Sequence, residues 1–209
     1  VNREGVARVT VRRLCEPNRY CAYRAAWSDD PRAAITTWCT PRPRMSAALA
    51  DPLAYSGVLQ GQTLGLIFQK PPTRTRAPFA VGMFQLGGHA LFLGANDIQL
   101  NRGESVPDTA KVLSRMVNGI MARVFDHRDV QELARFAAVP VINGLSDLLH
   151  PCQALADYFT LLEKRGALEG LKVAYVGDGN NVCNELMFGA VKLGMRMSIA
   201  CPKGYEPHQ

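Results

Sequence analysis

The chain has 209 residues, of which 47% are hydrophobic, and its formal net charge is +6. This length and composition allow a buried core and correspond to one large domain, or to one domain with part of another. No apolar run approaches the roughly 18 residues that a membrane-spanning helix needs, so we expect a soluble protein without a membrane partner.

Residues 1–50 carry most of the basic character. They hold nine arginines, no lysine and four acidic residues, a net charge of +5. Their apolar residues follow no helical or strand period for longer than a turn or two, so we predict an atypical or poorly ordered leader. Its Arg-rich and fairly acid-poor composition resembles a transit segment that leads to a mitochondrion or plastid, the alternative to a cytoplasmic location. Asp29 and Asp30 do not fit such a segment, and a mistranslated, fused or divergent extension is the other interpretation. Because no lysine or base-reading motif is present, nucleic acid is not an expected partner.

The cysteines do not predict a metal site. None forms a CxxC pair and none has a histidine at zinc-site spacing, so we expect free thiols in a reducing compartment. The six residues are Cys15, Cys21, Cys39, Cys152, Cys183 and Cys201.

Beyond Leu59 apolar strands alternate with helical segments. The predicted strands are Thr63–Phe68, Ala90–Leu93, Ile120–Phe125, Val139–Asn143, Val173–Gly177 and Met197–Ala200. The predicted helices are Arg76–Leu86, Asp108–Val117, Asp129–Phe136, Cys152–Arg165 and Val182–Leu193. This alternation indicates an α/β fold, in which a parallel sheet carries helices on both faces. We predict a first domain at 51–149, a linking helix at 150–166 and the start of a second, Rossmann-like α/β domain at 167–209.

Ligands of such sheets bind at the carboxyl ends of the strands. Thr73, Arg74, Thr75 and Arg76 follow the strand that ends at Phe68, and they open a helix. Unpaired backbone N–H groups, the helix dipole, hydroxyls and guanidinium groups together suit a phosphate dianion. The alternative is a solvated helix start with a capping threonine.

Two further polar groups follow or interrupt predicted strands. His150 and Gln153 lie three residues apart at a helix start, where an imidazole and an amide can face one polar group. A structural helix cap is the alternative. Arg123 interrupts an apolar run, so its charge needs an anionic ligand or, alternatively, a buried carboxylate partner.

Residues 57–207 resemble the ornithine carbamoyltransferase family. The matching segments are Lys70–Arg76, Gln85–His89, Asp97–Gln99, Asp108–Arg115, His150–Gln153, Gly177–Asn181 and Pro202–Pro207. The aspartate carbamoyltransferases share the segments around Thr73 and His150, but Gly177–Asn181 and Pro202–Pro207 favour the ornithine branch.

The resemblance implies roles for the residues that match. Residues 51–149 would be the carbamoyl phosphate-binding domain, with the phosphate held at Thr73–Thr75, and residues 167–209 would belong to the ornithine-binding domain. Arg123, His150 and Gln153 would surround the carbamoyl group, and Gln99 would reach the site of a neighbouring subunit in a homotrimer. The substrate-binding candidates that complete this set are Arg76, Cys152 and Asn181.

Asn181 would contact L-ornithine. A helix N-cap and a nucleotide loop are the alternatives for its segment, although the segment lacks the GxGxxG spacing.

The implied reaction is the attack of the neutral δ-amine of ornithine on carbamoyl phosphate, which yields citrulline and phosphate. Arg123 and His150 would stabilise the carbamoyl oxygen, while Arg74 and the helix start would stabilise the departing phosphate. No metal or organic cofactor is expected.

Pro72, Pro78 and Glu185 differ from the residues usual in the family, and the chain ends at Gln209 after a strand, a helix and a strand of the second domain. We therefore expect weak carbamoyl phosphate binding without measurable citrulline formation by this chain alone. The alternative is a non-catalytic homologue or fragment that only binds anions or assembles with other chains.

Overall fold

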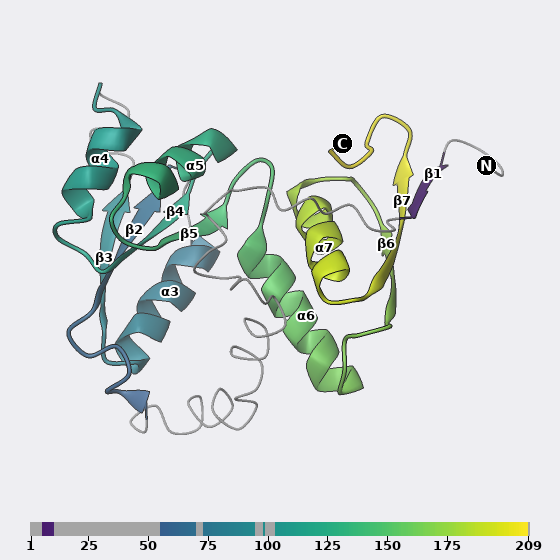
Figure 1. The fold of residues 1–209 in the computed structure, drawn as a ribbon, viewed down its shortest axis with the longest axis horizontal. Helices are drawn as coiled ribbons and strands as arrows, with labels where there is room; N and C mark the ends of the chain where they lie inside the picture. Colours follow the sequence, from purple (N-terminus) through teal and green to yellow (C-terminus); the bar gives the residue numbers. More distant parts are fainter. Residues whose placement is uncertain (1–5, 11–54, 70–72, 95–97, 99–102, 209) are drawn as a thin grey trace. The chain divides into compact units, whose positions relative to one another are not determined.

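The computed structural model describes residues 6–10, 55–69, 73–94, 98 and 103–208 (Figure 1). Side chains are described from residue 55 onward within these ranges, except those of Thr73 and Arg74. The described parts of the chain fall into two compact units. The first unit is Tyr20–Gly144, and the second unit is Leu145–Gln209 together with Val1–Arg19. The domain limits expected from the sequence stay predictions.

The first unit is built on a four-stranded sheet in the order β3-β2-β4-β5. β2 pairs in parallel with both β3 and β4, which makes β2 an inner strand of the sheet. The strands are β2 (Thr63–Phe68), β3 (His89–Gly94), β4 (Gly119–Arg123) and β5 (Val141–Leu145).

Helices cover both faces of this sheet, in agreement with the predicted fold class. α3 (Thr73–Gln85) packs on one face, where Met83 joins Leu66 and Phe68 in a buried cluster. α4 (Val106–Leu113) and α5 (His127–Phe136) pack on the other face. The cluster there includes Ile67 of β2, Leu113 of α4 and Leu133 of α5.

Local capping explains where α4 and α5 begin. The Ser105 hydroxyl accepts the N–H of Asp108 at 3.2 Å, and a carboxylate oxygen of Asp126 accepts the N–H of Arg128 at 2.8 Å. Each side chain satisfies a backbone donor that has no partner inside the helix.

α3 begins at Thr73, three residues before the predicted start, and therefore contains Pro78. Proline has no N–H, so the carbonyl of Arg74 lacks its usual helical partner, and a proline inside a helix costs about 3 kcal/mol. The buried contact of Met83 with the sheet offsets part of this cost.

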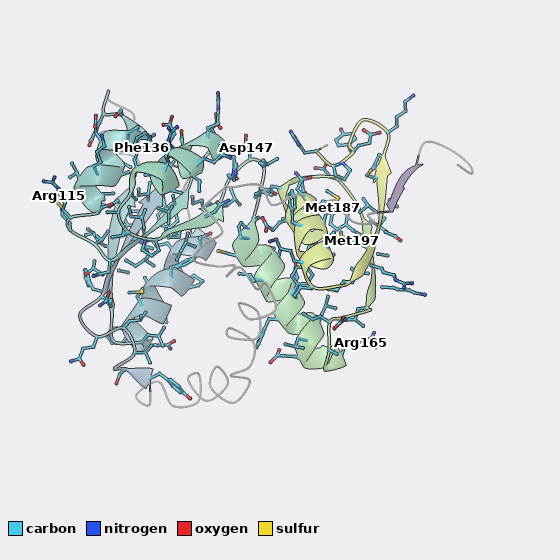
Figure 2. All side chains as sticks on the ribbon, in the orientation of Figure 1. Arg115, Phe136, Asp147, Arg165, Met187 and Met197 are labelled. Carbon is cyan, nitrogen blue, oxygen red and sulfur yellow. The ribbon has the colours of Figure 1, made fainter. Side chains whose placement is uncertain are left out.

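The second unit has its own three-stranded sheet in the order β1-β7-β6 (Figure 1). β6 (Lys172–Val176) and β7 (Arg196–Pro202) are parallel, and α7 (Asn181–Lys192) connects them. α6 (Pro151–Arg165) precedes them and ends at Gly166, whose positive φ of 80° suits glycine. Met197, labelled in Figure 2, is 2% exposed and belongs to the alternating buried positions of β7.

One element of the second unit was not among the predicted strands. Residues 1–50 were expected to be an atypical or poorly ordered leader, and within them Val6–Thr10 forms β1, which pairs antiparallel with β7. The pairing joins residues nearly two hundred positions apart, and local periodicity contains no trace of such a partner. The rest of the predicted leader lies outside the described residues.

Within the described ranges, no helix combines the length and the apolar character that crossing a membrane requires.

Candidate functional site

Arg123 lies at the carboxyl end of β4, in register with Phe68 at the end of β2. Its Nη1 atom donates a hydrogen bond to Oγ1 of Thr75, in the first turn of α3, at 2.5 Å. The structure therefore brings together two of the predicted ligand-binding residues. The contact joins the end of β4 to α3, the helix that follows the neighbouring strand β2. The sequence predicted an anion site at this place.

The charge of Arg123 has no counter-ion in the described part of the chain. Thr75 is its hydrogen-bond partner there and is neutral, and the buried Nε of Arg123 has no partner among the same residues. A half-buried guanidinium without a carboxylate favours an anionic ligand, because an anion would recover the lost solvation. The described residues thus do not support the alternative of a buried salt bridge for Arg123.

Gln69 holds the strand ends from which Arg123 emerges. Its side chain donates to Asp129 of α5 at 2.7 Å and accepts the N–H of Phe125 at 2.8 Å. Its backbone N–H donates to the carbonyl of Arg123 at 2.9 Å. Gln69 was not among the residues predicted from the sequence, although a single amide directly after an apolar strand was a usable signal. Gln69 thus links the end of β2 to the end of β4 and to α5, next to Arg123.

Arg76 has a different neighbour. Its guanidinium carbon lies 3.8 Å from the centroid of the Phe92 ring in β3. This cation–π contact places the charge over the edge of the sheet instead of at the Arg123–Thr75 pair. A role of Arg76 in substrate binding stays a prediction.

The structure does not describe the side chains of three candidate residues in the first unit. Thr73 and Arg74 are the first two residues of α3, but their side chains lie outside the description, as does the whole of Gln99.

His150 occupies the N-cap position of α6 with φ −136° and ψ 71°. Its carbonyl accepts the N–H groups of Gln153 and Ala154 at 3.1 and 3.3 Å, but its imidazole makes no capping hydrogen bond. The imidazole is half-buried, and its Nδ1 atom is buried. The backbone of His150 therefore starts the helix, and the side chain does not serve as its cap.

The other two candidates in this segment differ in exposure. Gln153 is exposed, and its amide donates to Asp157, one turn further along α6, at 3.0 Å. Burial and the nearby Glu185 carboxyl group raise the pKa of Cys152 to about 11. The Cys152 thiol is consequently neutral near pH 7, which excludes it as a thiolate nucleophile.

Asn181 is the first residue of α7, but the cap of this helix is Asn180. The side-chain oxygen of Asn180 accepts the N–H groups of Val182 and Cys183 at 3.0 and 3.3 Å. The amide of Asn181 donates to the carbonyl of Ser146 at 2.7 Å, in the loop that leads to His150. The capping alternative thus applies to the neighbouring asparagine.

The nucleotide-loop alternative has no support at the same place. The N–H of Gly179 donates to the carbonyl of Tyr205 at 2.9 Å, and Asn180 satisfies the next donors of the helix start. A dinucleotide phosphate would need those donors.

The candidates therefore form two sets, one in each unit. Thr75 and Arg123 belong to the first unit, and His150, Gln153 and Asn181 belong to the second.

Comparison with known proteins matches both units. Residues 40–163 match the family model of the aspartate/ornithine carbamoyltransferase carbamoyl-P binding domain. Residues 169–209 match the model of the Asp/Orn binding domain of the same family.

Individual relatives agree with these matches. An ornithine carbamoyltransferase of Thermococcus kodakarensis is 65% identical over 150 residues, which cover 72% of this chain and 48% of that protein. The solved ornithine carbamoyltransferase of Pyrococcus furiosus superposes with a TM-score of 0.80 and 52% identity, over 89% of this chain and 58% of that one. The enzyme of Thermus thermophilus gives a TM-score of 0.70 and 48% identity, over 77% and 59%. The chain spans about half the length of the curated relatives it matches.

Proposed function

The chain belongs to the aspartate/ornithine carbamoyltransferase family, and on this premise we propose that the protein transfers the carbamoyl group of carbamoyl phosphate to the δ-amine of L-ornithine. The products are L-citrulline and phosphate. The names of the similar proteins support ornithine over aspartate as the acceptor. The segments Gly177–Asn181 and Pro202–Pro207 favour the same branch.

The hydrogen bond from Arg123 to Thr75 carries this proposal. It places a guanidinium without a described counter-ion against the first turn of a helix, where the helix dipole favours an anion. Carbamoyl phosphate brings a phosphate dianion and a polarised carbonyl. Arg123 stabilises the negative charge that grows on the carbamoyl oxygen, and Thr73, Arg74 and Thr75 bind the phosphate that leaves.

The second unit supplies His150 and Gln153 in this proposal. The imidazole and the amide donate hydrogen bonds to the carbamoyl group, which fixes its carbon for attack by the neutral δ-amine. Asn181 binds the amino-acid end of ornithine while its amide also holds the Ser146 carbonyl. These steps use side chains and substrate groups alone, so the proposal includes no metal or organic cofactor.

Assembly is part of the same proposal. We assign the protein a homotrimer in which Gln99 enters the site of a neighbouring subunit. We also assign it a cytoplasmic location, with a mitochondrial or plastid one if residues 1–50 act as a transit segment.

Calorimetric titration with carbamoyl phosphate tests the anion site. Arg123→Ala should weaken binding at least about ten-fold, since a hydrogen bond to a charged group contributes roughly 1.5–3 kcal/mol. Arg115→Ala removes an equal charge from an exposed position of the first unit, and it should change the affinity less than about two-fold. Equal losses of affinity in both variants would show that only the net charge matters, and they would contradict the assigned role of Arg123.

Citrulline formation separates the proposed transfer from a second candidate function, anion binding without turnover. Pro78 favours the second candidate, because it weakens the helix whose first turn holds Thr75. Binding of carbamoyl phosphate without citrulline at saturating ornithine would establish the second candidate for this chain. Turnover that Arg123→Ala abolishes would establish the first.

A further inference from the structure

The first turn of α7 is in contact with two other backbone segments of the second unit. One is the loop Ser146–Leu149, which immediately precedes His150, and Figure 2 labels Asp147 in it. The other is the segment Lys203–His208 after β7. Asn181 hydrogen-bonds to the first of these segments, and Asn184 hydrogen-bonds to both. The function proposed above gives a role to Asn181 but none to Asn184.

The loop Ser146–Leu149 is closed on itself. The N–H of Ser146 donates to the carbonyl of Leu149 at 3.0 Å, and the N–H of Leu149 donates to the Ser146 hydroxyl at 3.1 Å. Ser146 is completely buried. Because Leu149 is bonded directly to His150, any displacement of this closed turn displaces the imidazole.

Asn184 binds this loop from α7. Its side-chain amide donates to the carbonyl of Leu148 at 3.1 Å, and its side-chain oxygen accepts the N–H of His208 at 3.1 Å. Asn184 is only 5% exposed, so water does not readily replace either partner. One planar group thus joins the loop before His150 to the segment after β7.

The segment after β7 is itself fixed to the loop between β6 and α7. The N–H of Gly179 donates to the carbonyl of Tyr205, and a Cβ atom at position 179 would overlap the backbone of Pro207. Asn184 therefore connects the loop before His150 to a segment that is itself hydrogen-bonded to the loop between β6 and α7.

We propose that Asn184 is a positioning residue for His150, a role that rests on the function proposed above. The position requires a donor and an acceptor on one short side chain. Asparagine supplies both, whereas alanine supplies neither and an ionised aspartate supplies only acceptors. With Asn184 in place, the imidazole of His150 is held before carbamoyl phosphate binds, so binding loses less conformational entropy of the loop and side chain.

Amide hydrogen exchange of the whole chain tests whether Asn184 holds the loop. Asn184→Ala should accelerate exchange of the Ser146 and Leu149 amides about ten-fold, the consequence of losing a buried hydrogen bond. The matched control is Tyr158→Phe, which removes the hydrogen bond from Tyr158 to the Leu186 carbonyl in the same helix pair. The control should leave both loop amides within about two-fold. Unchanged exchange in Asn184→Ala would overturn the proposal.

Asn184→Asp provides a second variant if alanine loosens the whole of α6 and α7. When protonated, the introduced carboxyl group matches the amide as donor and acceptor, and when ionised it cannot donate to Leu148. Burial raises the pKa of such a group, so loop protection relative to the native chain should be present near about pH 5 and lost by about pH 8. Protection that is independent of pH would contradict the proposed donor role.

A double-mutant cycle with carbamoyl phosphate tests whether Asn184 acts through His150. Asn184→Ala should weaken binding about five-fold in the native background and have no further effect in His150→Ala. Equal losses in both backgrounds would overturn the positioning role. If His150→Ala alone leaves the affinity unchanged, the proposed function fails at His150, and the exchange experiment still decides whether Asn184 holds the loop.

Discussion

The starts of α3 and α7 occupy equivalent places in the two units, since each follows a parallel strand, yet their polar groups are used differently. At α3 the Thr75 hydroxyl binds the guanidinium of Arg123, which has no described counter-ion. At α7 the asparagine side chains bind backbone groups of the protein itself. The first arrangement suits an anion, and the second holds loops. Equivalent topology therefore does not imply an equivalent ligand, because the side chains at the helix start decide which groups stay available.

Replacing Pro78 should have the largest effect on this comparison. Pro78→Ala restores the N–H that the Arg74 carbonyl lacks and should stabilise α3 by up to about 3 kcal/mol. Chemical denaturation measures the gain, and titration with carbamoyl phosphate should show tighter binding. A stabilised chain with unchanged affinity would separate the order of α3 from its anion binding.

Two glycine substitutions, one in each unit, should change the free energy of unfolding in opposite directions. A Cβ atom at Gly189 in α7 would overlap the Tyr158 ring of α6, whereas one at Gly82 in α3 would meet nothing within 4 Å. Gly189→Ala should therefore cost about 1–3 kcal/mol through overpacking. Gly82→Ala should gain about 0.5–1 kcal/mol from the lower entropy of the unfolded chain. Urea unfolding followed separately in each unit measures both changes, and equal signs would contradict the difference in packing.

Removing the α7 cap should have a smaller effect. Asn180→Ala exposes two backbone donors at the helix start and should cost about 1 kcal/mol. An inorganic phosphate titration then shows whether the uncapped α7 binds anions. New binding would show that the cap alone distinguishes α7 from α3, and its absence would show that the surrounding loops contribute as well.

The smallest expected effect is alkaline destabilisation of the second unit. Burial raises the pKa of Cys152 and of Cys183 to about 11, above the ordinary thiol value of 9.0. Both folded thiols keep their protons between these values while unfolded thiols lose them, so this contribution to stability is complete below pH 9 and falls as the pH rises toward 11. Alkylation followed by mass spectrometry should show slow modification of both residues at pH 8. Rapid modification of the folded chain would contradict the burial of these thiols.

The elements from residue 59 onward could be predicted because each carries its own local pattern. The β2 limits Thr63–Phe68 match the prediction at both ends. The other strands and helices differ from it by at most three residues at either end, apart from the last helical residues of α4. Apolar alternation and helical spacing are local properties, so neighbouring residues suffice to reveal them. The fold class and the family followed from these elements and from the motifs between them.

The contacts of the polar residues could not be predicted in the same way. An adjacent pair of asparagines does not reveal which one caps α7, and Asn180 caps it while Asn181 binds the loop before His150. Nothing near Gln69 in the sequence indicates that it reaches Asp129, sixty residues away. β1 was missed for the same reason, since its partner is β7.

Local sequence patterns were enough to predict the succession of strands and helices along the chain, the parallel α/β architecture of the first unit and the residue types available to bind an anion. These follow from patterns within a few residues and from motifs with characteristic spacing. The contact of Arg123 with Thr75, the pairing of β1 with β7 and the hydrogen bond from Asn184 to the loop before His150 became visible in the folded chain. A hydrogen bond depends on a distance of about 3 Å in space, and separation along the chain does not determine that distance.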